Sequence, residues 1–137
     1  MHRLVGYAAV AVVLIRLTWS VVPRGQRVRL RPSISDTLLY VRRLLSGSAP
    51  RSRGHNPLGL WMVWLMWLLV VALGVTGWMS RLDMFWGDEI VEDAHALLAD
   101  MLMVAAVVHV LAVCAMSLIW KENLPAAMVT GIKRAVE

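Results

Sequence analysis

Two histidines lie fourteen residues apart in the last long apolar run of the chain, which extends from Val91 to Trp120. In an α-helix this spacing places His95 and His109 within about 40° of the same face and about 21 Å apart along the axis. Ionisable side chains inside a membrane segment are costly and rare, so both are candidate functional residues. The alternative is that each imidazole only forms a hydrogen bond with a neighbouring helix.

The elements that must position these residues are membrane helices, because 59% of the 137 residues are hydrophobic. A spanning helix needs about 20 apolar residues. Three segments meet this requirement, at about residues 4–22, 58–79 and 96–120. The first one contains Arg16 and lacks a small-residue cleavage site, so it is interpreted as a retained helix and not as a signal peptide. We therefore expect an all-α membrane helix bundle, residues 1–137, with no separate soluble domain.

Cys114 is the only cysteine in the chain. This excludes disulfides within the chain, iron–sulfur clusters and the covalent attachment of c-type haem. Any tightly bound cofactor must be held without thiolates. The formal net charge of +5 does not indicate nucleic-acid binding, because the charges are distributed as in a membrane protein.

The loop at residues 23–57 carries eight arginines and one acidic residue, Asp36, whereas residues 80–94 carry Arg81 and five acidic residues. By the positive-inside rule, loop 23–57 and the C-terminus are predicted to be cytoplasmic and loop 80–94 periplasmic. We expect the chain in the inner membrane of a bacterium, with its N-terminus on the periplasmic side.

Within loop 23–57, Ser35 or Asp36 is predicted to cap a short interfacial helix that lies in the membrane plane. Its apolar and basic sides are formed by Leu38, Leu39, Val41, Leu44 and Leu45 and by Arg42 and Arg43.

The second span begins at a recognisable helix start, with Asn56 as the cap and Pro57 at the first helical position. Near its other end, Gly74 and Gly77 lie one turn apart. Two glycines at this spacing allow either another helix or a flat macrocycle to approach the backbone closely, and helix packing is the commoner explanation.

Haem iron accepts imidazole as an axial ligand, and a low-spin electron-transfer haem takes one ligand on each face. In the predicted topology the first and third spans run in the same direction, which puts His2 level with His95. These two histidines are therefore the predicted axial ligands of one haem.

Arg16 lies fourteen residues after His2, so the same spacing places it level with His109. A guanidinium at this depth either binds a haem propionate or extends to the cytoplasmic interface, and the sequence leaves both possibilities open. His55 is predicted to lie too far from the level of His109 to share an iron with it.

These residues occur in stretches that resemble the bacterial cytochrome b561 and nickel-dependent hydrogenase b-type cytochrome family. The matching stretches cover nearly the whole chain in order: His2–Tyr7, Leu14–Trp19, Gly54–Gly59, Val75–Gly77, Asp93–His95, His109, Lys121–Leu124 and Met128–Lys133. The resemblance implies a di-haem membrane protein that passes electrons between the quinone pool and a redox partner. It also implies that His2 pairs with His95.

The family pattern has four spans, and this chain starts where the second span of the family starts. The resemblance implies that the histidine which pairs with His109 belongs to the absent first helix. We therefore expect either an N-terminally shortened member or another subunit that supplies this helix. His109 is the ligand of a second haem only when a partner completes the site.

Together these arguments predict a membrane b-type cytochrome that holds haem b through His2 and His95, with His109 and Arg16 as further cofactor-binding residues. It would be an electron-transfer subunit of a respiratory chain and not a stand-alone catalyst. Two other classes stay open: a haem-free membrane anchor or assembly subunit, and half of a transporter with histidines in a proton path.

Overall fold

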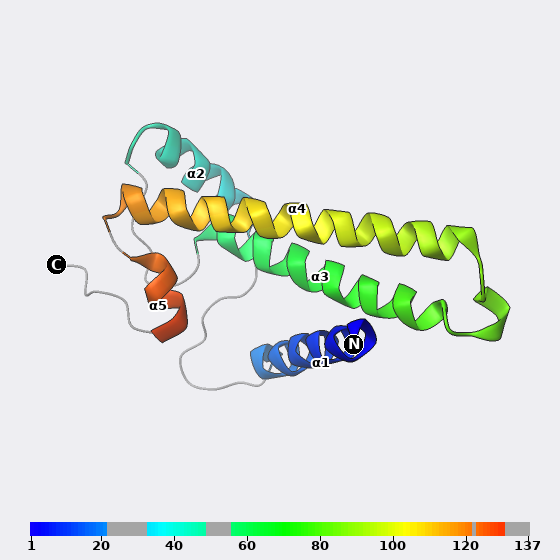
Figure 1. Cartoon of the computed structure of the whole chain (residues 1–137). Coiled ribbons are helices and arrows are strands. Elements are labelled where there is room, and N and C mark those ends of the chain that lie inside the picture. The colour runs from blue at the N-terminus through cyan, green and yellow to red at the C-terminus, as the bar shows by residue number, and fades with distance from the viewer. Residues whose placement is uncertain (22–32, 49–55, 122, 131–137) are drawn as a thin grey trace. The chain divides into compact units, whose positions relative to one another are not determined.

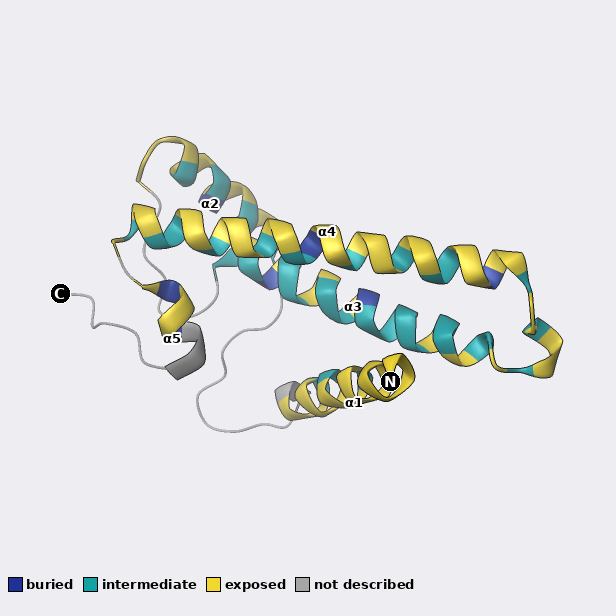
Figure 2. Cartoon of the chain, viewed as in Figure 1, coloured by how far each residue is buried: buried dark blue, intermediate teal, exposed yellow. Residues whose placement is uncertain are grey.

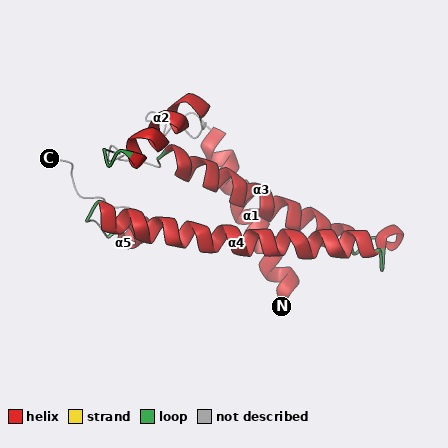
Figure 3. Ribbon diagram, turned by 90° about the horizontal axis from the view of Figure 1, so that it is seen from above, coloured by secondary structure: helices red, strands yellow, loops and turns green. Residues whose placement is uncertain are grey.

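The fold was analysed in a computed structural model, which describes residues 1–21, 33–48, 56–121 and 123–130. The described residues form helices and turns without strands (Figures 1 and 3). The elements are α1 (His2–Val21), α2 (Ile34–Leu45), α3 (Pro57–Met79), the 3-10 turn η1 (Asp83–Phe85), α4 (Glu89–Ile119) and α5 (Leu124–Thr130). The expected all-α architecture is confirmed.

Three of these helices, α1, α3 and α4, are long and apolar enough to cross a membrane. The predicted start of the second span is confirmed, because α3 begins at Pro57 and the Asn56 Oδ1 atom accepts a hydrogen bond from the Gly59 N–H at 2.6 Å. Few side chains of the three helices are buried within the protein (Figure 2). Their apolar surfaces are therefore suited to contact with lipid.

Two helix starts differ from the sequence prediction. Residues 80–94 were predicted to be a loop, but α4 begins at Glu89, because the Asp88 Oδ1 atom caps it by accepting hydrogen bonds from Ile90 and Val91 N–H at 2.9 and 3.2 Å. The acidic residues that follow were interpreted as loop because of their polarity, yet acidic side chains favour the first turn of a helix. Likewise, α2 is capped by Ser33 and not by Ser35 or Asp36.

The chain forms two compact units. The first contains α1, the part of α3 from Val63 and the part of α4 up to Ala105. Within this unit Leu69, Val91 and Ala105 are buried. Because Gly74 has no side chain, α1 lies close to α3: a Cβ at this position would be 2.5 Å from Val10 Cγ2. Close packing of helices thus explains Gly74.

The second unit contains α2, the start of α3 up to Met62, the part of α4 from Ala106, and α5. Its buried apolar side chains are Tyr40, Leu60, Leu124 and Ala127. α5 was not predicted from the sequence. It is held at its start by two side chains: Asn123 Oδ1 accepts from Ala126 N–H at 3.0 Å, and Ser117 Oγ accepts from Leu124 N–H at 3.3 Å.

Candidate functional site

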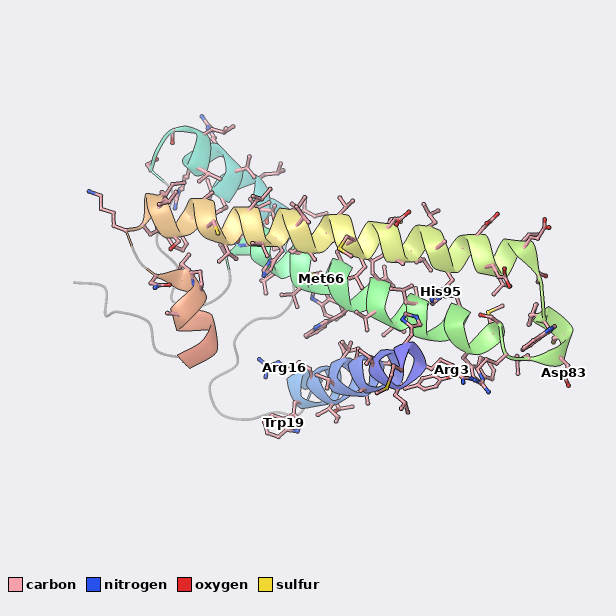
Figure 4. The ribbon with its side chains drawn as sticks, in the orientation of Figure 1. Arg3, Arg16, Trp19, Met66, Asp83 and His95 are labelled. Atoms are coloured by element: carbon pink, nitrogen blue, oxygen red, sulfur yellow. The ribbon has the colours of Figure 1, made fainter. Side chains whose placement is uncertain are left out.

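The candidate site lies in the first unit, where His2 of α1 and His95 of α4 meet. Their ring centroids are 6.3 Å apart, and the ring planes are nearly perpendicular, at 89°. His2 is the first residue of α1, and His95 lies in the second turn of α4. Figure 4 shows the His95 ring beside the first turn of α1. The two histidines that were predicted to form a pair are therefore close together.

The separation of the two rings fits a haem iron between them. A bond between a metal and an imidazole nitrogen is about 2 Å long, and this nitrogen lies about 1 Å from the centre of its ring. Two imidazoles on opposite faces of one iron are then about 6 Å apart between centroids, compared with 6.3 Å here. Two aromatic rings in direct edge-to-face contact fall in the same range.

A hydrogen bond from α3 orients the His95 ring. The Oγ1 atom of Thr76, on α3, lies 2.8 Å from His95 Nδ1 and 3.0 Å from the carbonyl oxygen of Ala72. A hydroxyl has one proton to donate. When it donates to Ala72, it accepts the Nδ1 proton of His95, and His95 Nε2 then carries the free lone pair. A histidine that binds a metal is usually held in this way through its other ring nitrogen.

Gly77 provides the space for this ring. A Cβ at Gly77 would lie 3.2 Å from His95 Cε1 and 3.7 Å from His95 Nδ1. A larger residue would therefore require the imidazole to shift by a few tenths of an ångström. Gly74 and Gly77, one turn apart, thus have different neighbours: the first faces a helix and the second faces the candidate ligand.

Arg16 borders a separate groove in the first unit. This groove has a volume of about 490 Å³ and is lined by Val12, Val13, Ile15, Arg16, Trp19 and Trp67. It combines an apolar wall and two indole rings with one guanidinium, and the Arg16 side chain is exposed. Such a lining suits a flat apolar molecule that carries an anionic group.

The remaining histidines are not part of this pair. His109 is half-buried on α4 in the second unit, whereas Arg16 belongs to the first, so their expected level arrangement stays a prediction. His55 lies outside the described residues. Within the described ranges, no group of three or more His, Cys, Asp or Glu side chains could hold a metal ion. The candidate centre therefore consists of two imidazoles and their neighbours.

Thr76 and Trp67 were not identified as site residues from the sequence. Spacing along one helix reveals which residues share a face, but it does not reveal which residue of another helix they meet. A weak signal was present for Thr76, because it is a hydroxyl residue in a strongly apolar span, next to Gly77.

The comparisons with known proteins identify the family of the chain. Residues 1–131 match the family model described as prokaryotic cytochrome b561. No curated protein and no solved structure matches the chain. The family match includes both α1, which carries His2, and α4, which carries His95. The chain therefore belongs to the prokaryotic cytochrome b561 family, and it is a membrane protein of the b-type cytochrome class that functions in electron transfer.

Proposed function

We propose that the chain carries electrons between the quinone pool and a redox partner through a haem b held by His2 and His95. The observation that carries this proposal is the 6.3 Å separation of the two imidazole rings. It is supported by the hydrogen bond between Thr76 and His95, which leaves Nε2 of His95 available to iron. Quinone as the electron donor or acceptor rests on the family resemblance.

Each residue of the site has a defined task in this proposal. His2 and His95 would hold the haem iron, and Thr76 would fix the orientation and the tautomer of His95. Gly77 leaves room for the His95 ring beside α3. When bound, the haem supplies a one-electron couple. The surroundings of this couple, where His95 is half-buried and His2 is exposed, would influence its reduction potential.

A second haem is proposed at His109, with its other ligand supplied by a partner chain. Arg16 is proposed to bind a haem propionate, and the groove that it shares with Trp19 and Trp67 supports such a role. The membrane is proposed to be the bacterial inner membrane, with residues 23–57 and the C-terminus cytoplasmic, because arginines are concentrated in that loop.

The test is the haem content of the purified full chain, measured together with the reduced-minus-oxidised visible spectrum. We expect a b-type spectrum, and we expect His95→Ala to remove more haem than any other single histidine substitution. His55→Ala is the matched control, because it removes an imidazole outside the proposed pair. Full haem loading in His95→Ala would contradict the assignment, and a chain without any haem spectrum would favour the membrane-anchor class.

The proposed haem site at His109 can be tested separately by its response to carbon monoxide. A haem at His109 in the isolated chain would lack one protein ligand, so added carbon monoxide should perturb its spectrum and His109→Ala should abolish this response. Two low-spin haems per isolated chain that do not react with carbon monoxide would contradict the need for a partner.

A further inference from the structure

Helix α2 is attached to the N-terminal end of a helix long and apolar enough to span the membrane. The indole N–H of Trp61, on α3, donates to Thr37 Oγ1 at 3.1 Å, and the side-chain amide of Asn56 donates to Tyr40 Oη at 3.2 Å. Tyr40 is only 4% exposed. Since α3 enters the membrane at this end, α2 is held at the level of the lipid headgroups.

A strip of apolar side chains on α2 is left uncovered by this attachment. Ile34, Leu38 and Leu45 are 69%, 66% and 84% exposed. At 100° per residue these three side chains lie within about 40° of one another around the helix axis. The centre of this strip is about 110° from the mean direction of Thr37 and Tyr40, the side chains that contact α3. When α2 lies in the membrane plane with Thr37 and Tyr40 against α3, this strip is therefore directed roughly along the membrane normal. The hydrophobic effect favours the orientation in which the strip enters the acyl chains.

The two arginines of α2 occupy different positions relative to this strip. Arg42 lies about 60° from its centre, at the edge of the face that meets the lipid, whereas Arg43 lies about 160° away, on the opposite side. Both side chains are exposed. Asp36 is the only acidic residue among the described residues of the second unit, so the charge of this surface is positive.

From this arrangement we propose that α2 binds the headgroup of an anionic phospholipid through Arg42 while Ile34, Leu38 and Leu45 contact its acyl chains. Arg42 is the one basic side chain of α2 that borders the apolar strip, so its guanidinium reaches the phosphate level while its stem stays in apolar surroundings. Arg43 faces the aqueous side. The inference is independent of haem binding.

The test compares two neighbouring residues that carry the same charge. The full chain, purified in a neutral detergent, is titrated with phosphatidylglycerol or with phosphatidylcholine of identical acyl chains, and bound lipid is counted by native mass spectrometry. We expect a preference for phosphatidylglycerol. Arg42→Gln should weaken its binding about five-fold, the contribution of one basic residue near an anionic surface, whereas Arg43→Gln should change it less than two-fold. Arg42→Lys, which keeps the charge, should retain the preference.

Three results would overturn the proposal. Equal losses in Arg42→Gln and Arg43→Gln would mean that only the total charge matters. Equal binding of the two lipids would mean that no anionic headgroup is recognised, as expected if the surface instead serves a protein partner. Displacement of phosphatidylglycerol by inorganic phosphate alone would show that the site recognises a free anion. Circular dichroism of each variant verifies that the helices are retained.

Discussion

The hydrogen bond between Thr76 and His95 provides the sharpest test of the proposed site. Thr76→Val keeps the shape of the side chain but removes the oxygen that lies 2.8 Å from His95 Nδ1. The Nδ1 proton of a half-buried ring then has no acceptor, which costs about 1–3 kcal/mol. Loss of a comparable partner of a metal-binding histidine reduces metal affinity about 10- to 100-fold. We therefore expect haem to bind at least about ten-fold more weakly.

The same substitution should also change the reduction potential. A hydrogen bond from Nδ1–H makes the opposite nitrogen a more basic ligand, which favours ferric iron. Thr76→Val should therefore raise the midpoint potential. Haem titration and redox titration of the purified chain measure the two effects, with Thr76→Ser as the control that keeps the hydroxyl. Wild-type haem affinity and midpoint potential in Thr76→Val would refute the reasoning. If Thr76→Ser, which keeps the hydroxyl, binds haem as weakly as Thr76→Val does, packing of the side chain is the cause and not the hydrogen bond.

Three further predictions concern the packing of α1 on α3, the hydroxyl of Tyr40 and the membrane topology. Gly74→Val should push α1 away from α3 and lower the haem content of the purified chain, while Gly6→Ala, where nothing lies within 4 Å of the new Cβ, should leave it unchanged; equal haem content in both variants would contradict this. Burial raises the pKa of Tyr40 above 10.0, although the Asn56 hydrogen bond lowers it in part. Its contribution to stability is therefore complete below about pH 10 and lost as the pH rises through the raised pKa, so Tyr40→Phe should remove the latest component of an alkaline tyrosinate titration. A reporter fused after Arg51 should be cytoplasmic and one inserted near Gly87 periplasmic, and the opposite pattern would reverse the proposed topology.

Much of the fold follows from local sequence signals. Long apolar runs predict the three spans, and Asn56 followed by Pro57 predicts the first turn of α3. The start of α4 was missed because the charged residues after Asp88 resemble a loop, although they suit a capped first turn. Local signals therefore predicted the three long helices and the start of α3, but they missed α5 and the start of α4.

The site was predictable only as far as helix direction and depth determine it. The predicted direction and depth of the first and third spans placed His2 and His95 at the same level, and the two rings are 6.3 Å apart. The rotation of α3 about its axis, which turns Thr76 and Gly77 towards His95, depends on packing between helices. No residue spacing within α3 specifies that rotation.

Helix α1 has a further consequence for the integrity of the fold. None of its membrane-spanning window is buried within the protein, compared with 11% for α3 and 6% for α4. A haem bound by His2 and His95 would be a cross-link between residues far apart in the sequence. Such a cross-link lowers the conformational entropy of the state in which α1 is detached from α3 and α4, as a disulfide does when it closes a long loop. Haem binding would thus stabilise the association of α1 with the other helices, and loss of the cofactor would favour detachment of α1.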